Sequence, residues 1–160
     1  MHHRLGRGAI GLLVASLAVT LIAAERPTFS ADDVFELEYA SDPRISPDGA
    51  RIVYERRAND IMSDRTRTDL WVVDVDGGRH RPLVAGAGSA TSPRFSPKGD
   101  RLAWIQSGGD GPEIRVRWFD APESAPVARL HERPRNLAWS PDGRWIAFTL
   151  SVEGSSAPLV

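Results

Sequence analysis

The sequence predicts an all-β protein, a partial β-propeller of about two and a half four-stranded blades with WD40-like repeats. The tetrapeptide Ser-Pro-Asp-Gly occupies residues 46–49 and 140–143, and Ser-Pro-Lys-Gly occupies residues 96–99. The copies begin 50 residues apart (46 to 96) and 44 residues apart (96 to 140). A repeat of roughly 40–45 residues is the length of one propeller blade.

Each tetrapeptide has the composition of a tight turn. Proline presets φ near about −65° at the first central position, aspartate bonds its own backbone, and glycine adopts a positive φ. A strand is therefore expected to end at the serine of each copy, and the next strand to begin just after the glycine.

The strands that follow the turns alternate between two apolar faces. The larger side chains share one face, namely Ile52, Tyr54, Leu102, Trp104, Ile146 and Phe148. The other face carries the smaller Val53, Ala103 and Ala147. A sheet that is apolar on both faces suits a blade covered on both sides by its neighbours.

Composition excludes several classes of protein. The 160 residues carry a formal net charge of −1 and are 41% hydrophobic, the balance of an ordinary globular protein rather than of a basic nucleic-acid-binding domain. The sequence holds no cysteine, which excludes a disulfide framework and a cysteine-ligated metal site. The chain can form a core, but it is too short for a closed propeller of roughly 4–8 blades.

Residues 1–24 are expected to form a signal peptide. A basic start with Arg4 and Arg7 precedes an apolar run at residues 9–24, and Ala23-Ala24 provides a small-residue exit. The protein is then exported, either periplasmic or secreted. The alternative is an uncleaved membrane anchor, although the run of 16 residues is shorter than the roughly 20 that a spanning helix needs.

Residues 25–41 are expected to form a lead-in with a short helix over residues 30–39. Ser30 with Asp33 three positions on matches an N-cap with an acidic partner. Its buried side would consist of Val34, Phe35 and Leu37. The helix should end before Pro43, because proline disfavours helical conformation in the preceding residue.

Residues 42–160 are expected to form the incomplete propeller, with blades at about 42–85, 92–131 and 135–160. The expected strands are residues 44–46, 51–55, 69–75 and 81–84, then 94–96, 101–106, 113–119 and 127–130, then 136–140 and 144–150. A charged loop is expected at 56–68, an Asp-Gly hairpin turn at 76–78 and a flexible linker at 86–90. In strand 113–119, Glu113, Arg115 and Arg117 alternate with apolar residues, which predicts a solvent-exposed face.

Several residues were weighed as candidates for chemistry, and each has a better structural explanation. Ser89 follows two glycines, but the order is not Gly-x-Ser-x-Gly and no strand is expected to lead into it. Asp74 and Asp76 resemble the start of a calcium loop, yet Ala85 stands where its twelfth-position glutamate should be. His80 and His131 stand alone in polar loops, without the cluster that a metal requires.

The tryptophans and the charged loop are likewise assigned to structure. All five tryptophans lie in expected strands and are interpreted as core residues: Trp71, Trp104, Trp118, Trp139 and Trp145. The loop at 56–68 is interpreted as solvated, with a role on a propeller face as the alternative. We therefore predict no catalytic, cofactor-binding or metal-binding residue in this chain.

Three stretches of the chain resemble a known family. They are residues 41–49 (Ser-Asp-Pro-Arg-Ile-Ser-Pro-Asp-Gly), 69–78 (Asp-Leu-Trp-Val-Val-Asp-Val-Asp-Gly-Gly) and 137–143 (Leu-Ala-Trp-Ser-Pro-Asp-Gly). With the helix ahead of them, they are similar to the N-terminal part of serine peptidases of the prolyl oligopeptidase family (S9), of the acylaminoacyl-peptidase or dipeptidyl-aminopeptidase type. The resemblance covers roughly residues 30–150.

The resemblance implies a function for the parent protein. Members of this family pair a propeller with a C-terminal α/β-hydrolase domain that carries a Ser/Asp/His triad, and the propeller limits entry to short peptides. None of the triad positions matches a residue of this chain, and the implied partners are that hydrolase domain and peptide substrates, with no cofactor. The Glu-Glu pair of the family's dipeptidyl peptidases has no counterpart among these 160 residues.

Two alternatives stay open at this point. One is a non-enzymatic periplasmic binding propeller similar to TolB, although the repeats begin too soon after residue 24 to leave room for the α/β domain of such proteins. The other is a short protein whose copies assemble to close a ring.

Export can be tested directly. A reporter that is active only outside the cytoplasm, fused after residue 40, should be active, because the basic start and the apolar run form an export signal. The matched control is the same fusion with residues 9–24 removed, which should stay inactive. An inactive reporter in the intact fusion would contradict the expectation.

Overall fold

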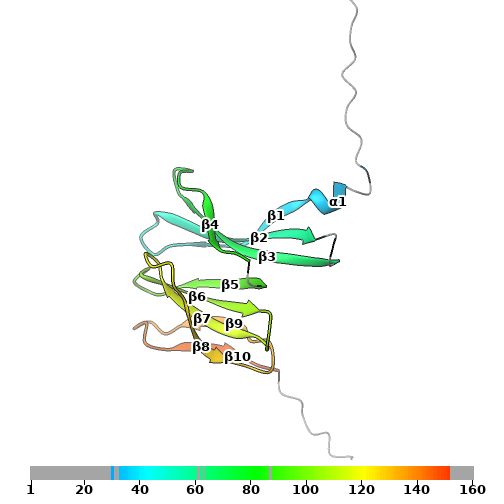
Figure 1. The fold of residues 1–160 in the computed structure, drawn as a ribbon. Coiled ribbons are helices and arrows are strands. Elements are labelled where there is room, and N and C mark those ends of the chain that lie inside the picture. Colours follow the sequence, from blue (N-terminus) through cyan, green and yellow to red (C-terminus); the bar gives the residue numbers. More distant parts are fainter. Residues whose placement is uncertain (1–29, 31–32, 61, 63, 87, 152–160) are drawn as a thin grey trace, which may run out of the picture.

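The computed structural model describes residues 30, 33–60, 62, 64–86 and 88–151, so the expected signal peptide at 1–24 lies outside the described residues. The described part is one short helix followed by ten strands (Figure 1). The elements are α1 (Asp33–Glu36), β1 (Glu38–Ile45), β2 (Arg51–Asp60), β3 (Arg65–Asp74), β4 (Arg81–Val84), β5 (Ser89–Phe95), β6 (Arg101–Ser107), β7 (Glu113–Trp118), β8 (Ala125–Arg129), β9 (Arg135–Trp139) and β10 (Ile146–Thr149). Among the described residues, no helix has the length and apolarity to cross a membrane.

The strands form three separate antiparallel sheets. The orders are β1-β2-β3-β4, β5-β6-β7-β8 and β9-β10, with neighbours in sequence always paired. The sheets lie one above the next, and β5 contacts strands β1, β2 and β3 of the first sheet as well as β9 of the third (Figure 1). The expected all-β architecture of stacked, repeated units is confirmed.

The repeated tetrapeptide closes the first turn of each sheet, as expected. The Gly49 amide donates to the carbonyl of Ser46 at 2.8 Å, and the other two copies repeat this bond at 2.9 Å. The serine hydroxyl has a role that the sequence does not predict, since it accepts a hydrogen bond from the backbone amide of Arg51, two residues after the turn, at 3.0 Å. The same bond joins Ser96 to Arg101 and Ser140 to Trp145, at the first residue of β6 and one residue before β10.

The same serine hydroxyl also donates to a carboxylate. Its acceptor is Asp48 in the first copy and Asp142 in the third. In the second copy Lys98 stands at that position, and Asp100 accepts the Ser96 hydroxyl instead, at 2.7 Å. In each case the hydrogen bond from the serine lowers the pKa of the aspartate below its ordinary value of 3.8.

The first strand of each sheet contains an irregularity that the sequence analysis did not predict. Asp42, Ser92 and Asn136 occupy equivalent places and have φ values of 45°, 56° and 53°. Asp and Asn tolerate this left-handed conformation better than other residues do. In β1 and β5 the register shifts at this point, as in a β-bulge.

The expected helix over 30–39 is wrong in length and in burial. Within the described residues the helix comprises Asp33–Glu36, and Val34, Phe35 and Leu37 are 40%, 37% and 50% exposed. From Glu38 the chain pairs with β2, so cross-strand hydrogen bonds replace helical ones. Pro43 does not separate a helix from a strand, because it follows the bulge inside β1.

The charged loop expected at 56–68 is also wrong. β2 and β3 pair without interruption from Arg51 with Asp74 to Asp60 with Arg65, which forms a long hairpin. Its charged side chains pair with one another or with β1: Arg57 with Glu55 at 2.7 Å, and Arg56 with Glu38. The first contact lies within β2 and the second joins β2 to β1, and both stabilise a segment that has no apolar alternation to reveal it.

The linker expected at 86–90 is partly strand, since β5 begins at Ser89. The other expected strands lie close to their predicted places, and β4 has the predicted bounds. The turn at 76–78 is confirmed, with Gly77 at φ 87° and its amide bonded to the carbonyl of Asp74 at 2.8 Å.

Two apolar clusters lie between the sheets. The first, between sheets one and two, contains Val53, Leu70, Val72, Leu83, Ala90, Leu102, Trp104 and Phe119. The second, between sheet two and the β9–β10 pair, contains Ala103, Ile105, Ile114 and Leu137. Alternate residues of β6 thus enter opposite clusters, and the middle sheet is covered on both faces as expected.

At the boundary between the first two sheets, the carboxylate of Glu55 contacts strands of both sheets. Its carboxylate, on a side chain that is 3% exposed, accepts the Ser92 amide at 2.8 Å and the Ser41 hydroxyl at 3.1 Å. Arg57 donates to the same carboxylate at 2.7 Å. Glu55 therefore holds the irregular positions of β1 and β5 against each other.

The turn glycines give a stability prediction. Replacing Gly49 with Val should destabilise the chain by about 1–2 kcal/mol, because φ is 72° there and a β-branched residue is strained in that conformation. Gly143→Val should cost more, since its Cβ would lie 3.1 Å from Nη2 of Arg101. Urea unfolding of the full chain measures both, and Ala50→Val in the same turn is the control. Equal losses at Gly49 and Ala50 would contradict the backbone explanation.

The Glu55 junction gives a second stability prediction. Glu55→Ala should cost about 2 kcal/mol, because the buried Ser92 amide loses its acceptor. Glu55→Gln should cost less, since the amide oxygen can still accept that bond. Exposed Glu132→Ala is the control and should stay within about 0.5 kcal/mol of the unchanged protein in the same unfolding experiment. A loss for Glu55→Gln as large as that for Glu55→Ala would show that charge, not the hydrogen bond, matters.

Candidate functional site

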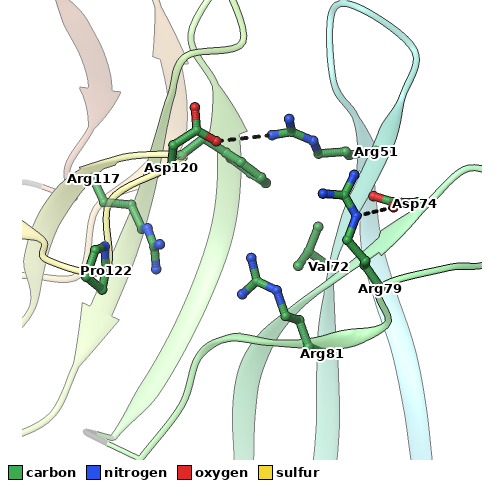
Figure 2. A pocket seen from close by; sticks show the side chains of 9 residues that line it. Arg51, Val72, Asp74, Arg79, Arg81, Arg117, Asp120 and Pro122 are labelled. Carbon is green, nitrogen blue, oxygen red and sulfur yellow. Dashed lines mark hydrogen bonds and ion pairs between the residues drawn. The ribbon is translucent and has the colours of Figure 1, made fainter.

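A pocket opens between the first and second sheets, at the end where β2 and β4 begin and where β3 and β7 end (Figure 2). Its volume is about 320 Å³. The residues that line it are Arg51, Val72, Asp74, Arg79, Arg81, Arg117, Phe119, Asp120 and Pro122.

Strand register brings these residues together. Arg51 pairs with Asp74 across β2 and β3, and Val72 pairs with Arg81 across β3 and β4. The turn between β3 and β4 adds Arg79, so the first sheet supplies three arginines. The second sheet supplies Arg117 near the end of β7.

Two of the arginines have carboxylate partners. Nε of Arg79 donates to Oδ2 of Asp74 at 2.5 Å, and this hydrogen bond raises the pKa of the exposed Arg79 guanidinium. Arg51 lies over the ring of Phe119, with 4.6 Å between its Cζ and the ring centroid. Its Nη1 is 4.0 Å from Oδ1 of Asp120, whose side chain is 95% exposed, so this ion pair is loose.

Arg117 is the buried arginine among the four that line the pocket, with 9% of its surface exposed. Its Nη1 donates to the carbonyl of Leu83 at 3.0 Å across the boundary between the sheets, and its Nε donates to the Trp118 carbonyl at 3.3 Å. Burial lowers the pKa of its guanidinium, and the positive charge of Arg81 lowers it further. Within the described part of the chain, no carboxylate lies within 4 Å of it.

The expectation that Arg117 lies on a solvent-exposed face is therefore wrong. The alternation in β7 was identified correctly, but the face that carries Arg117 meets the first sheet, while Trp118 on the opposite face is 57% exposed. Sequence alone did not indicate which face of a strand the neighbouring sheet would cover.

The pocket has the chemistry of an anion site. Four guanidinium groups face two carboxylates, so positive charge is in excess. Its lining residues include no serine, histidine or lysine to act as nucleophile or base. Guanidinium groups bind carboxylate and phosphate oxygens in pairs.

The residues weighed from sequence lie elsewhere and are not brought together. Ser89 is at the start of β5, where its hydroxyl accepts the Thr68 amide at 3.3 Å, which is a structural contact. The ring of His80 stacks on that of Tyr54, and its Nε2 is hydrogen-bonded to the Tyr54 hydroxyl at 2.6 Å. His131 lies in an exposed loop. Among the described residues, no three histidines, aspartates or glutamates are grouped as a metal site would require.

The expectation that all five tryptophans are core residues is wrong, because two of them are exposed. Trp104 is 1% exposed, and Trp71 and Trp139 are half-buried. Trp118 and Trp145 are 57% and 70% exposed, and Trp145 precedes β10 rather than lying within it. The arginines of the pocket were not singled out from sequence, because they come from three separate segments, the start of β2, residues 79–81 and the end of β7, that only the stacking of two sheets brings together.

Comparison with known proteins identifies peptidases among the relatives, although no family model matches the chain. The uncharacterized peptidase YuxL of Bacillus subtilis is 30% identical over 129 residues, which is 79% of this chain and 20% of that protein. Dipeptidyl-peptidase 5 of Porphyromonas gingivalis is 31% identical over 120 residues, 69% of this chain and 18% of that protein. The chain spans about a fifth of the length of these relatives.

Solved structures show the same fold. An acylaminoacyl peptidase from Pyrococcus horikoshii matches 71% of this chain and 17% of its own, with a TM-score of 0.60 and 19% identity. The β-propeller domain of the trilobed protease from Pyrococcus furiosus matches 69% of this chain and 34% of its own, with a TM-score of 0.57 and 23% identity. The expected partial propeller is confirmed.

A protein assigned as TolB from Agrobacterium tumefaciens also shares the fold. It matches 69% of this chain and 38% of its own, with a TM-score of 0.56 and 22% identity. At that identity the likeness concerns architecture alone, whereas the two relatives at 30% and 31% identity are peptidases.

Proposed function

We propose that this chain, which belongs to the propeller region of the prolyl oligopeptidase (S9) family of peptidases, controls which substrates reach the catalytic centre of a serine peptidase. The hydrolysis itself would be carried out by an α/β-hydrolase domain with a Ser/Asp/His triad. The substrates would be short peptides, because a propeller admits only what fits through its central channel.

The alignment of the first strands is the observation that supports this role. β5 lies beside β1 and β9, so the first strand of each sheet lies along the same edge of the stack (Figure 1). Arg94 of β5 donates to Asp42 of β1 at 2.9 Å, and the Trp139 indole of β9 donates to the Arg94 carbonyl at 3.0 Å. In a propeller this edge faces the channel, where side chains meet whatever enters.

Export of the protein is part of the same proposal. The basic start and the apolar run at 9–24 support an exported peptidase that acts outside the cytoplasm, whether the segment is cleaved or retained.

The proposal predicts that hydrolysis requires the full reading frame and is absent from residues 25–160 alone. Residues 25–160 alone should not hydrolyse a short chromogenic peptide and should not react with a serine-directed phosphonate, because these residues carry no Gly-x-Ser-x-Gly elbow. The full reading frame that encodes the chain should hydrolyse the short peptide and leave a folded protein intact.

A matched comparison isolates the propeller. The hydrolase domain expressed without the propeller, if it retains phosphonate labelling, should accept longer polypeptides than the full reading frame does. Stoichiometric labelling of residues 25–160 would overturn the proposal. A full reading frame that neither hydrolyses peptides nor labels would favour a binding propeller instead.

A further inference from the structure

We propose that the pocket between the first two sheets binds an oxyanion, the carboxylate or phosphate group of a small ligand, through Arg51, Arg81 and Arg117. This site is separate from the channel edge and does not depend on the proposed peptidase function.

The guanidinium groups converge on one space. In Figure 2 the guanidinium groups of Arg51, Arg79 and Arg81 point from the first sheet toward the same space that Arg117 enters from the second. An anion placed there would contact both sheets at once.

Part of the positive charge that faces the pocket is buried. Arg117 is nine-tenths buried, and its hydrogen-bond acceptors are backbone carbonyls rather than a carboxylate. A buried charge is costly unless an opposite charge accompanies it. The neighbouring Arg81 adds a like charge, and its own acceptor is the Pro82 carbonyl at 3.4 Å.

The carboxylates already present offset this charge only in part. Glu123 attracts Arg117 and opposes the lowering of its pKa, but burial and Arg81 outweigh it. Asp74 is bonded to Arg79 at 2.5 Å, on the side of the pocket formed by the first sheet. Asp120 reaches Arg51 at 4.0 Å and is 95% exposed, so water screens it. An incoming oxyanion would compete with Asp120 for Arg51 and would give Arg81 and Arg117 a charged acceptor.

The volume and the lining of the pocket indicate a small ligand with an anionic group. A volume of about 320 Å³ lies at the small end of the roughly 300–1,000 Å³ range of ligand pockets. Val72 and Pro122 are small apolar parts of a wall that is otherwise mostly charged. Planar guanidinium groups bind two oxygens of one carboxylate or phosphate group.

Binding can be measured on the full 160-residue chain with inorganic phosphate as the probe. Equilibrium dialysis with radiolabelled phosphate gives the dissociation constant, and thermal melting in phosphate or chloride of equal ionic strength gives an independent reading. We expect saturable binding and a higher melting temperature in phosphate, because a ligand of the folded state stabilises it.

Matched variants locate the site. Arg81→Gln should weaken phosphate binding about tenfold or more and remove the shift in melting temperature, because it deletes a charge-assisted hydrogen bond. Arg81 is exposed, so the variant should still fold. Arg135→Gln, exposed on β9, removes the same charge outside the pocket and should change neither reading. Absence of saturable binding, or equal losses in both variants, would overturn the proposal.

A second probe distinguishes the sources of the anion. Glycylglycine and its C-terminal amide differ only in the terminal carboxylate. Competition with phosphate by glycylglycine but not by the amide, lost in Arg81→Gln, would assign the site to peptide carboxylates. Phosphate binding that neither dipeptide displaces, also lost in Arg81→Gln, would assign it to phosphate groups. Equal competition by both dipeptides would overturn the proposal, because charge would then not be recognised.

Discussion

Each sheet of this protein has two apolar faces, and both can be kept from water only by a neighbouring sheet on each side. The middle sheet shows how this works, since Leu102 and Trp104 of β6 face the first sheet while Ala103 and Ile105 face the third. Burying one such large side chain contributes about 1.5–3 kcal/mol. Stacking is therefore the source of stability, and the turns and hydrogen bonds define how the stacked sheets are aligned.

Polar groups at the boundary between sheets are also removed from water, so each needs hydrogen-bond partners or an opposite charge within the protein. Glu55 is buried where β1 and β5 meet, and it is tolerated because amide, hydroxyl and guanidinium donors surround its carboxylate. Arg117 is buried at the outer part of the same boundary, with carbonyl acceptors but no carboxylate partner among the described residues. One boundary thus contains an anion with several hydrogen-bond donors and a cation with no carboxylate within 4 Å in the described part of the chain, although Glu123 attracts it from farther away.

The repeats share their turns and differ at their boundaries. Every copy keeps the serine that starts the next strand, and the second copy preserves the serine–carboxylate bond through Asp100 although Lys98 replaces the aspartate. Arg51 and Arg101 begin equivalent strands, yet Arg51 stacks on Phe119 whereas Arg101 stacks on Trp139 and donates to the Gly143 carbonyl at 2.8 Å. Ile105 occupies the place that Glu55 holds in the first sheet. The contacts that these side chains make therefore belong to individual boundaries rather than to the repeat.

The sequence by itself determined the repeat, the turns and most strands, because tight turns depend on local chemistry: proline restricts φ and Gly49 adopts a positive one. Local pattern could not reveal the hairpin of β2 and β3, whose charged residues are held by backbone pairing between the two strands and, at Arg56, by Glu38 of β1. It also misjudged the short helix, where pairing of Glu38 with Ala58 outweighed helix propensity. Only the tertiary structure decided that Arg117 is buried and that four arginines share one pocket, because that depends on which face of each sheet its neighbour covers.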